Sequence, residues 1–171
     1  MKRNAPTPQL PRTVPFLLAG VLVVLVAVTL AFTVRLVIVD GQVSADESRR
    51  QVVLQAARQQ ALNFTTIGYP TVDRDINRVI AGATGDFKSS YQQNRGTIKD
   101  TVTKNKSTSK GEVLDAGLVS IDSDSAVALV VADASVTNVA YKKPTLRNYR
   151  MQLDLSKVGD RWLVSNIEFV S

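Results

Sequence analysis

The sequence predicts an α+β protein with one N-terminal transmembrane helix, followed by three helices packed on a curved four-stranded antiparallel sheet. Three observations support this fold class. An uncharged apolar run covers residues 16–34. Apolar residues then recur at helical spacing, and after Gly111 the pattern changes to that of strands. Helices followed in the chain by strands are typical of the α+β class.

Residues 14–39 are predicted to form the transmembrane helix. The run over residues 16–34 would extend roughly 28 Å as a helix, close to the hydrocarbon thickness of about 30 Å. Basic residues precede the run, and no acidic residue occurs before Asp40. The positive-inside rule therefore predicts a single-pass plasma-membrane protein with a disordered cytoplasmic tail (1–13) and an extracytoplasmic domain (40–171).

A cleaved signal peptide is the alternative interpretation of this segment. Val43, Ser44 and Ala45 supply the small residues of a cleavage site. The apolar run, however, is longer than the usual apolar region of a signal peptide, about 7–15 residues, and the candidate site lies well past its end. The length favours a retained anchor.

Composition limits the chemistry that the chain can perform. Of the net charge of +6, residues 1–39 supply +4, which leaves +2 for the domain. Most of the basic charge is therefore explained by the orientation of the chain in the membrane. Because the domain itself is only weakly basic, we expect no nucleic-acid partner. The sequence has neither histidine nor cysteine and no glycine-rich phosphate loop. The usual general base, zinc ligands and thiol nucleophile are therefore missing. We expect no catalytic residue, no metal and no cofactor, hence a protein that is not an enzyme.

Three helices are expected in the first half of the domain. The first runs from Ser44 to about Thr66 and the second over residues 72–81, with Gly82 ending it. The third begins at Thr84, which is a suitable N-cap residue. Its apolar stripe contains Phe87, Tyr91, Ile98 and Val102.

Four strands are expected in the second half, over residues 112–121, 126–137, 146–155 and 161–170. The second of them is almost continuously apolar, which predicts a central strand covered on both faces. Its alanines at positions 126, 128, 132 and 134 share one face, where they leave space for closely packed helices. The third strand alternates apolar and polar residues, and Val158, Gly159 and Asp160 form the turn before the fourth.

A family resemblance narrows the function. The motif residues are Tyr69, the block Asp75-Ile76-Asn77-Arg78-Val79-Ile80-Ala81-Gly82-Ala83-Thr84-Gly85-Asp86-Phe87, Tyr91, Val113, Ala116-Gly117-Leu118, Val136-Thr137-Asn138, Tyr149-Arg150, Gly159 and Trp162-Leu163-Val164. Together with the basic tail and single span, this pattern resembles the actinobacterial Mce-associated membrane proteins.

The resemblance implies a conical domain similar to the SnoaL-like and nuclear-transport-factor-two-like folds. It also implies a non-enzymatic accessory role beside an Mce transporter, an ABC-type system that moves lipids or sterols through the mycobacterial-type envelope. The partners would be Mce transporter subunits and the membrane, and the role would be assembly or stabilisation of the complex.

Two other functions stay open at this point. A lipid- or sterol-binding module would use the interior of the cone as its pocket. An enzyme built like ketosteroid isomerase would need a buried aspartate near Tyr149, whereas Asp115 is expected to point outward and no enzyme motif matches. Asp75 and Arg78 are expected on a solvated helix face. The candidate pocket or partner contacts are Phe87, Tyr91, Tyr149, Arg150 and Trp162.

Overall fold

The computed structural model describes residues 46–170 of the 171-residue chain. The predicted tail (1–13), the predicted transmembrane helix (14–39) and the candidate cleavage site lie outside these residues. Within the described part, no helix combines the length and apolar character that a membrane crossing requires.

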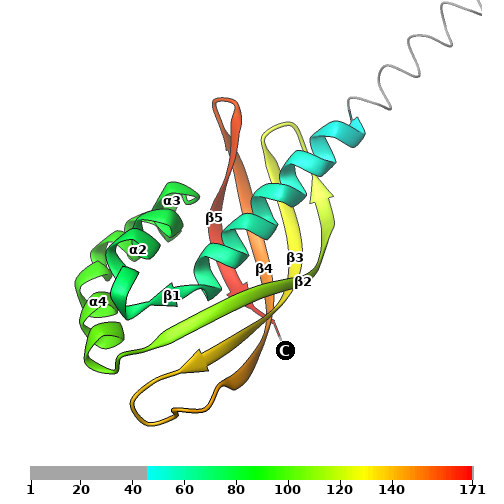
Figure 1. Cartoon of the computed structure of the whole chain (residues 1–171). Coiled ribbons are helices and arrows are strands. Elements are labelled where there is room, and N and C mark those ends of the chain that lie inside the picture. The colour runs from blue at the N-terminus through cyan, green and yellow to red at the C-terminus, as the bar shows by residue number, and fades with distance from the viewer. Residues whose placement is uncertain (1–45, 171) are drawn as a thin grey trace, which may run out of the picture. The chain divides into compact units, whose positions relative to one another are not determined.

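The described strands form one antiparallel sheet in which the strand order follows the chain. Its strands are β1 (Ile67–Gly68), β2 (Thr108–Ile121), β3 (Ser125–Thr137), β4 (Thr145–Val158) and β5 (Arg161–Phe169). The sheet curls around the helices (Figure 1). The prediction of four strands is therefore one short, because the two residues of β1 pair with Ser109 and Thr108 but are too few to show an alternating pattern.

The helices cover one face and one end of this sheet. A long helix over residues 46–65 runs across the sheet, and the other helices gather beside its C-terminal end (Figure 1). These are the 3-10 helix η1 (Tyr69–Thr71), α2 (Val72–Ala81), α3 (Gly85–Gln93) and α4 (Arg95–Lys104). The predicted bounds of the second helix, 72–81, are confirmed.

The single third helix of the prediction is wrong, because Asn94 divides it into α3 and α4. Both the backbone N–H of Asn94 and its side-chain Nδ2 donate to the carbonyl of Ser90. Local bonds of this kind let asparagine compete with helix continuation. As a result, Phe87 of α3 packs against the main core, whereas Val102 of α4 packs with Val72 and Ile76 in a second, smaller core.

The main core lies between the long helix and the inner face of the sheet, which we define as the face turned toward that helix. On β3 the inner face consists of buried alanines and Val130, as the alanine spacing predicted. The helix presents Val53, Ala57 and Ala61, which are also buried. Small side chains on both sides allow the helix to approach the sheet closely, and Met151, Leu153 and Leu155 of β4 complete the core.

Asp75 is buried, so the expectation of a solvated position for it is wrong. Its Oδ2 accepts hydrogen bonds from the Gly68 N–H at 2.9 Å and from Thr71 Oγ1 at 2.6 Å. Its Oδ1 lies 3.0 Å from the guanidinium of Arg78. A buried carboxylate needs such partners, and here they join β1, η1 and α2.

The glycine-rich block after α2 connects the helices to β5. The Val164 N–H donates to the Gly82 carbonyl, and the Thr84 N–H donates to the Val164 carbonyl. Thr84 occupies the N-cap position of α3 as expected, although its side chain makes no capping hydrogen bond. Gly85 follows with φ of +54°, a value that favours glycine.

Candidate functional site

The structure separates the five candidate contact residues into three groups. Phe87 and Tyr91 of α3 and Tyr149 of β4 share the inner side of the sheet. Trp162 is a buried core residue. Arg150 follows Tyr149 in β4, so its side chain lies on the opposite face of the sheet, where it is exposed.

Phe87, Tyr91 and Tyr149 belong to an aromatic cluster that Phe64 and Phe169 complete. Phe64 is central, with ring centroids 6.4 Å from Phe87, 6.4 Å from Tyr91 and 6.0 Å from Phe169. Phe169 lies 6.0 Å from Tyr149, and all these pairs are tilted. Tilted pairs at such distances are favourable aromatic contacts. Because Phe169 is 58% exposed, the aromatic cluster extends from the core to the surface.

Tyr91 is a half-buried member of the aromatic cluster. Burial raises the pKa of Tyr91, and the negative charge of Asp75 raises it further. Tyr91 therefore keeps its proton at neutral pH. The cluster is therefore a set of packed rings in which the protonated hydroxyl of Tyr91 lies within the influence of the charge of Asp75.

The aspartates that an isomerase-like enzyme would need lie elsewhere. Asp115 is exposed at the edge strand β2, as expected, with Oδ1 3.4 Å from the guanidinium of Arg58. Asp133 faces away from the core and accepts a hydrogen bond from Asn148 Nδ2 at 2.7 Å. Among residues 46–170, no group of three or more carboxylates could hold a metal ion.

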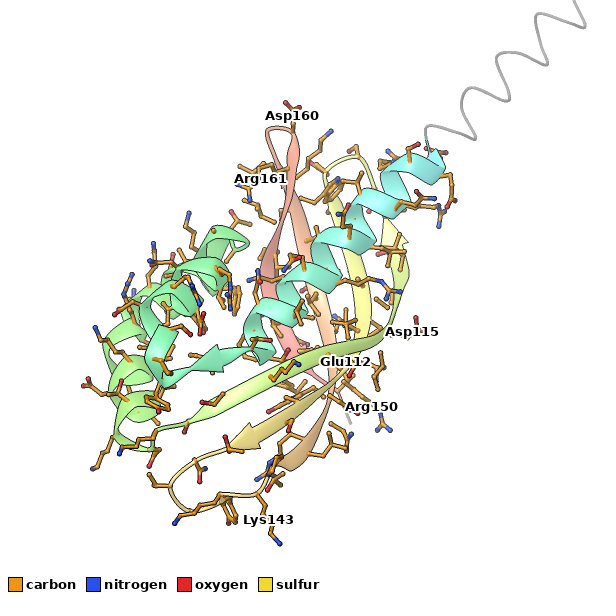
Figure 2. The ribbon with its side chains drawn as sticks, in the orientation of Figure 1. Glu112, Asp115, Lys143, Arg150, Asp160 and Arg161 are labelled. Carbon is orange, nitrogen blue, oxygen red and sulfur yellow. The ribbon has the colours of Figure 1, made fainter. Side chains whose placement is uncertain are left out.

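A cleft of about 580 Å³ lies between the long helix, α2 and the β4–β5 turn. Figure 2 shows Asp160 and Arg161 at this turn. The lining is mixed: it includes the side-chain amides of Gln55, Gln59, Gln60 and Asn63 and the apolar residues Val52, Ala56, Trp162 and Leu163. Arg161 is held in place, since its guanidinium donates to the Ala81 carbonyl at 3.0 Å. None of its lining residues belongs to the aromatic cluster, so the two features are separate.

The outer face of the sheet, opposite the long helix, is unexpectedly apolar and exposed. On β3, Leu129 is 43% and Val131 is 38% exposed, so the prediction that both faces of this strand are covered is wrong within the described residues. On β2, Leu114 is 53% and Val119 is 61% exposed. Both lie at register shifts, where an extra residue joins the outward-facing set.

Sequence reasoning missed Phe64, Phe169 and the outer face. Phe64 follows Val53, Ala57 and Ala61 at helical spacing, which was a usable signal. For Phe169 the signal is lost, because Val164 pairs with Leu155 while Asn166 pairs with the adjacent Asp154. The additional residue in β5 shifts the alternation, so that Phe169 shares a face with Trp162 despite their odd separation.

Comparison with known families identifies related sequences. The family model described as "Uncharacterized protein Rv1363c/MT1408-like" matches residues 14–171. Uncharacterized protein Rv1363c of Mycobacterium tuberculosis (strain ATCC 25618 / H37Rv) is 30% identical over 124 residues, which are 72% of this chain and 48% of the relative. The chain thus spans about half the length of the curated relatives that it matches.

Comparison with solved structures identifies the fold. An IcmL-like type IV secretion system protein from Legionella pneumophila aligns with a TM-score of 0.57 and 14% identity, covering 71% of this chain and 91% of that one. The VirB8 protein of Agrobacterium tumefaciens aligns with a TM-score of 0.56 and 12% identity, covering 70% and 90%. At such identities the likeness concerns the fold alone, and it agrees with the expected cone-like architecture.

Proposed function

Because the chain belongs to the Rv1363c/MT1408-like family, we propose that it acts as a non-enzymatic accessory protein that assembles an envelope complex through protein contacts. Residues 14–39 would anchor it in the plasma membrane, with the N-terminus in the cytoplasm and the domain on the extracytoplasmic side. One observation carries the proposal: the domain exposes contiguous apolar side chains on its outer face, while its buried ionisable group, Asp75, is saturated with structural hydrogen bonds.

The fold neighbours support an assembly role by analogy. The IcmL-like protein is described as a component of a type IV secretion system, which is a multiprotein machine. The same architecture in this chain would present surfaces to partners rather than a reaction centre. Fold analogy is associational, so the proposal rests chiefly on the exposed surface described above.

The finer proposal is that the complex is an Mce-type importer of lipids or sterols. This assignment rests on the motif block over residues 75–87, which resembles that of the Mce-associated membrane proteins. The test is a pull-down of the tagged full chain in a detergent that preserves complexes, followed by protein identification. We expect Mce transporter subunits in the eluate and none with an untagged chain. A protein that stays stable in the membrane yet recovers no such subunit would overturn the Mce assignment.

A lipid-binding module is the second candidate, and the aromatic cluster favours it. A row of aromatic rings that begins in the core and ends at exposed Phe169 could hold an acyl chain or a sterol ring. Native mass spectrometry of the purified full chain would then detect retained lipid.

Two matched variants separate these candidates. Phe169→Ser alters the surface end of the aromatic cluster, and Val158→Ser alters a similarly exposed residue beside the β4–β5 turn. Loss of lipid in Phe169→Ser alone would support the lipid-binding module. Because Phe169 does not lie on the outer face, the accessory role predicts that Phe169→Ser still recovers the transporter subunits.

A further inference from the structure

We propose that the outer face of the sheet binds a second copy of this chain, with β3 packed against β3 about a two-fold axis that runs along this strand. The part of the outer face that carries the proposal contains Leu114, Asp115, Val119, Leu129, Val131 and Arg150. The inference takes from the proposed function only the idea that this face contacts protein, and it does not depend on an Mce partner.

The apolar part of the outer face is central and continuous. Leu129 and Val131 are alternate residues of β3, so their side chains lie on the same face. Leu114 and Val119 flank them on β2. Their exposure leaves apolar area in water that a partner would remove, at roughly 25 cal/mol per Å².

The charges around this centre form an ordered row across three strands. In the register of the sheet, Val131 pairs with Asp115 on one side and with Arg150 on the other. Asp115 and Arg150 are thus two strand spacings apart, about 10 Å, with an apolar residue between them. Arg150 makes no ion pair with any described residue, whereas the carboxylate of Asp115, at the edge strand, lies 3.4 Å from the guanidinium of Arg58 on the long helix.

An acid–apolar–base row is complementary to itself in one orientation only. A two-fold axis along β3 turns the sheet over and exchanges its β2 and β4 sides. Asp115 of each copy then faces Arg150 of the other, and Val131 meets its own equivalent. An axis across the strands would instead place β2 over β2, with no opposite charge for Asp115. The charge pattern therefore selects the axis along β3.

The adjacent rows fit the same orientation and set its limits. Leu129 lies between Gly117 and Gln152, so the long amide of one copy would face the glycine of the other. In the row beyond Val131, Asp133 would meet its own equivalent and be repelled by it, while Glu112 would face Asn148 of the other copy. Because the outer side of a curled sheet is convex and packed sheets cross at about 30°, contact would be confined to the central rows.

The size of the patch predicts a weak contact. Three strands and about five residues along each give roughly 15 Å by 15 Å, below the footprint of a standard specific interface. We therefore expect association in the micromolar range in solution, strengthened in a membrane, where anchoring raises the effective concentration.

Cysteine cross-linking tests the contact directly, since the natural chain contains no cysteine. Val131→Cys places the thiol close to the proposed axis, and because facing sheets lie about 10 Å apart, a short bismaleimide can link it to its equivalent in the second copy. Val52→Cys, at an exposed position of the long helix, is the matched control. In membranes containing the full chain, a short bismaleimide cross-linker should give a covalent homodimer with Val131→Cys and at least about tenfold less with Val52→Cys.

Charge reversal tests the orientation. Asp115→Lys and Arg150→Glu should each weaken self-association about tenfold, because like charges then meet twice across the axis. Mixing the two variants should restore association, since the introduced lysine of one copy would face the introduced glutamate of the other. The remaining native Arg150 and Asp115 would also face each other in that mixed pair. Sedimentation velocity of the detergent-solubilised full chain gives the association constants. Loss of the Arg58 contact in Asp115→Lys is a small perturbation because that pair is exposed.

The outcomes separate clearly. A Val131→Cys homodimer together with rescue on mixing supports the proposal. Equal cross-linking at both positions, cross-links only to other proteins, or absence of rescue would overturn it. None of these results depends on the pull-down of transporter subunits, so the two proposals can fail independently.

Discussion

The two faces of β3 differ in a way that reverses the usual expectation for a sheet. The inner face has small alanines that are buried, whereas the outer face has the larger Leu129 and Val131, which are exposed. The inner residues are small because the long helix approaches closely, with Ala57 and Ala61 at the contact. The outer residues have no such restriction inside the chain. The difference shows that an apolar residue need not be buried within its own chain. On β3, the small side chains mark the face that packs against the long helix.

The largest expected effect compares two leucines on opposite faces of adjacent strands. Leu153→Ala opens a cavity in the main core and should lower the free energy of unfolding by about 2–5 kcal/mol. Leu129→Ala, on the outer face, should lower it by less than about 1 kcal/mol. Urea denaturation followed by the fluorescence of Trp162, the single tryptophan, measures both. Equal losses would show that the outer face is covered within the chain.

Two glycines of β2 sharpen the same comparison. A Cβ at Gly111, on the inner face, would collide with the side chain of Thr65, whereas a Cβ at Gly117, on the outer face, would meet nothing within 4 Å. Gly111→Ala should therefore cost about 1–3 kcal/mol of unfolding free energy. Gly117→Ala should be neutral or slightly stabilising, because alanine has less conformational freedom to lose. The same denaturation assay applies, and a neutral Gly111→Ala would contradict the close packing of the long helix.

The smallest expected effect is the pH dependence of the unfolding free energy that Tyr91, on the inner side of the sheet, contributes. Burial raises the pKa of Tyr91 above the ordinary value of 10.0. Below that pH the folded and unfolded chains hold the same proton, so stability does not vary through this group. Above it the unfolded chain releases the proton first, and the free energy of unfolding falls as the pH rises toward the folded pKa.

Tyr91→Phe should remove this alkaline fall, while Tyr69→Phe, at an exposed tyrosine, should retain it. Thermal unfolding between about pH 8 and about pH 11 measures the slope, with the range set by the ordinary tyrosine pKa. An unchanged slope in Tyr91→Phe would show that the ring is not buried in the aromatic cluster.

Much of the secondary structure could be predicted because strong patterns determine it. The bounds of α2 follow from Pro70 before it and Gly82 after it, and the faces of β4 follow from regular alternation. The strand β1 could not be predicted, since its two residues pair only because η1 and α2 hold them beside β2. The break at Asn94 depends on a local hydrogen bond that competes with an otherwise continuous helical stripe.

The candidate site was predictable only in part. Phe87 and Tyr91 were placed together by helical spacing, and the alternation of β4 turned Tyr149 toward them. Arg150 lies on the opposite face of the sheet because neighbouring strand residues face opposite sides, and Trp162 lies in the core, where it also lines the cleft beside the β4–β5 turn. Asp75 lacks any sequence signal for burial, since its partners come from a separate turn at Gly68 and Thr71.

The two bulges of β2 affect how several copies of the chain can assemble. Beyond its short pairing with β1, β2 is a sheet edge whose free backbone groups could template another strand. The irregularities at Leu114 and Val119 interrupt the even spacing that such a template requires. Growth into an open-ended filament along this edge is thereby discouraged, and a closed pair, rather than a fibre, is the assembly that this geometry permits.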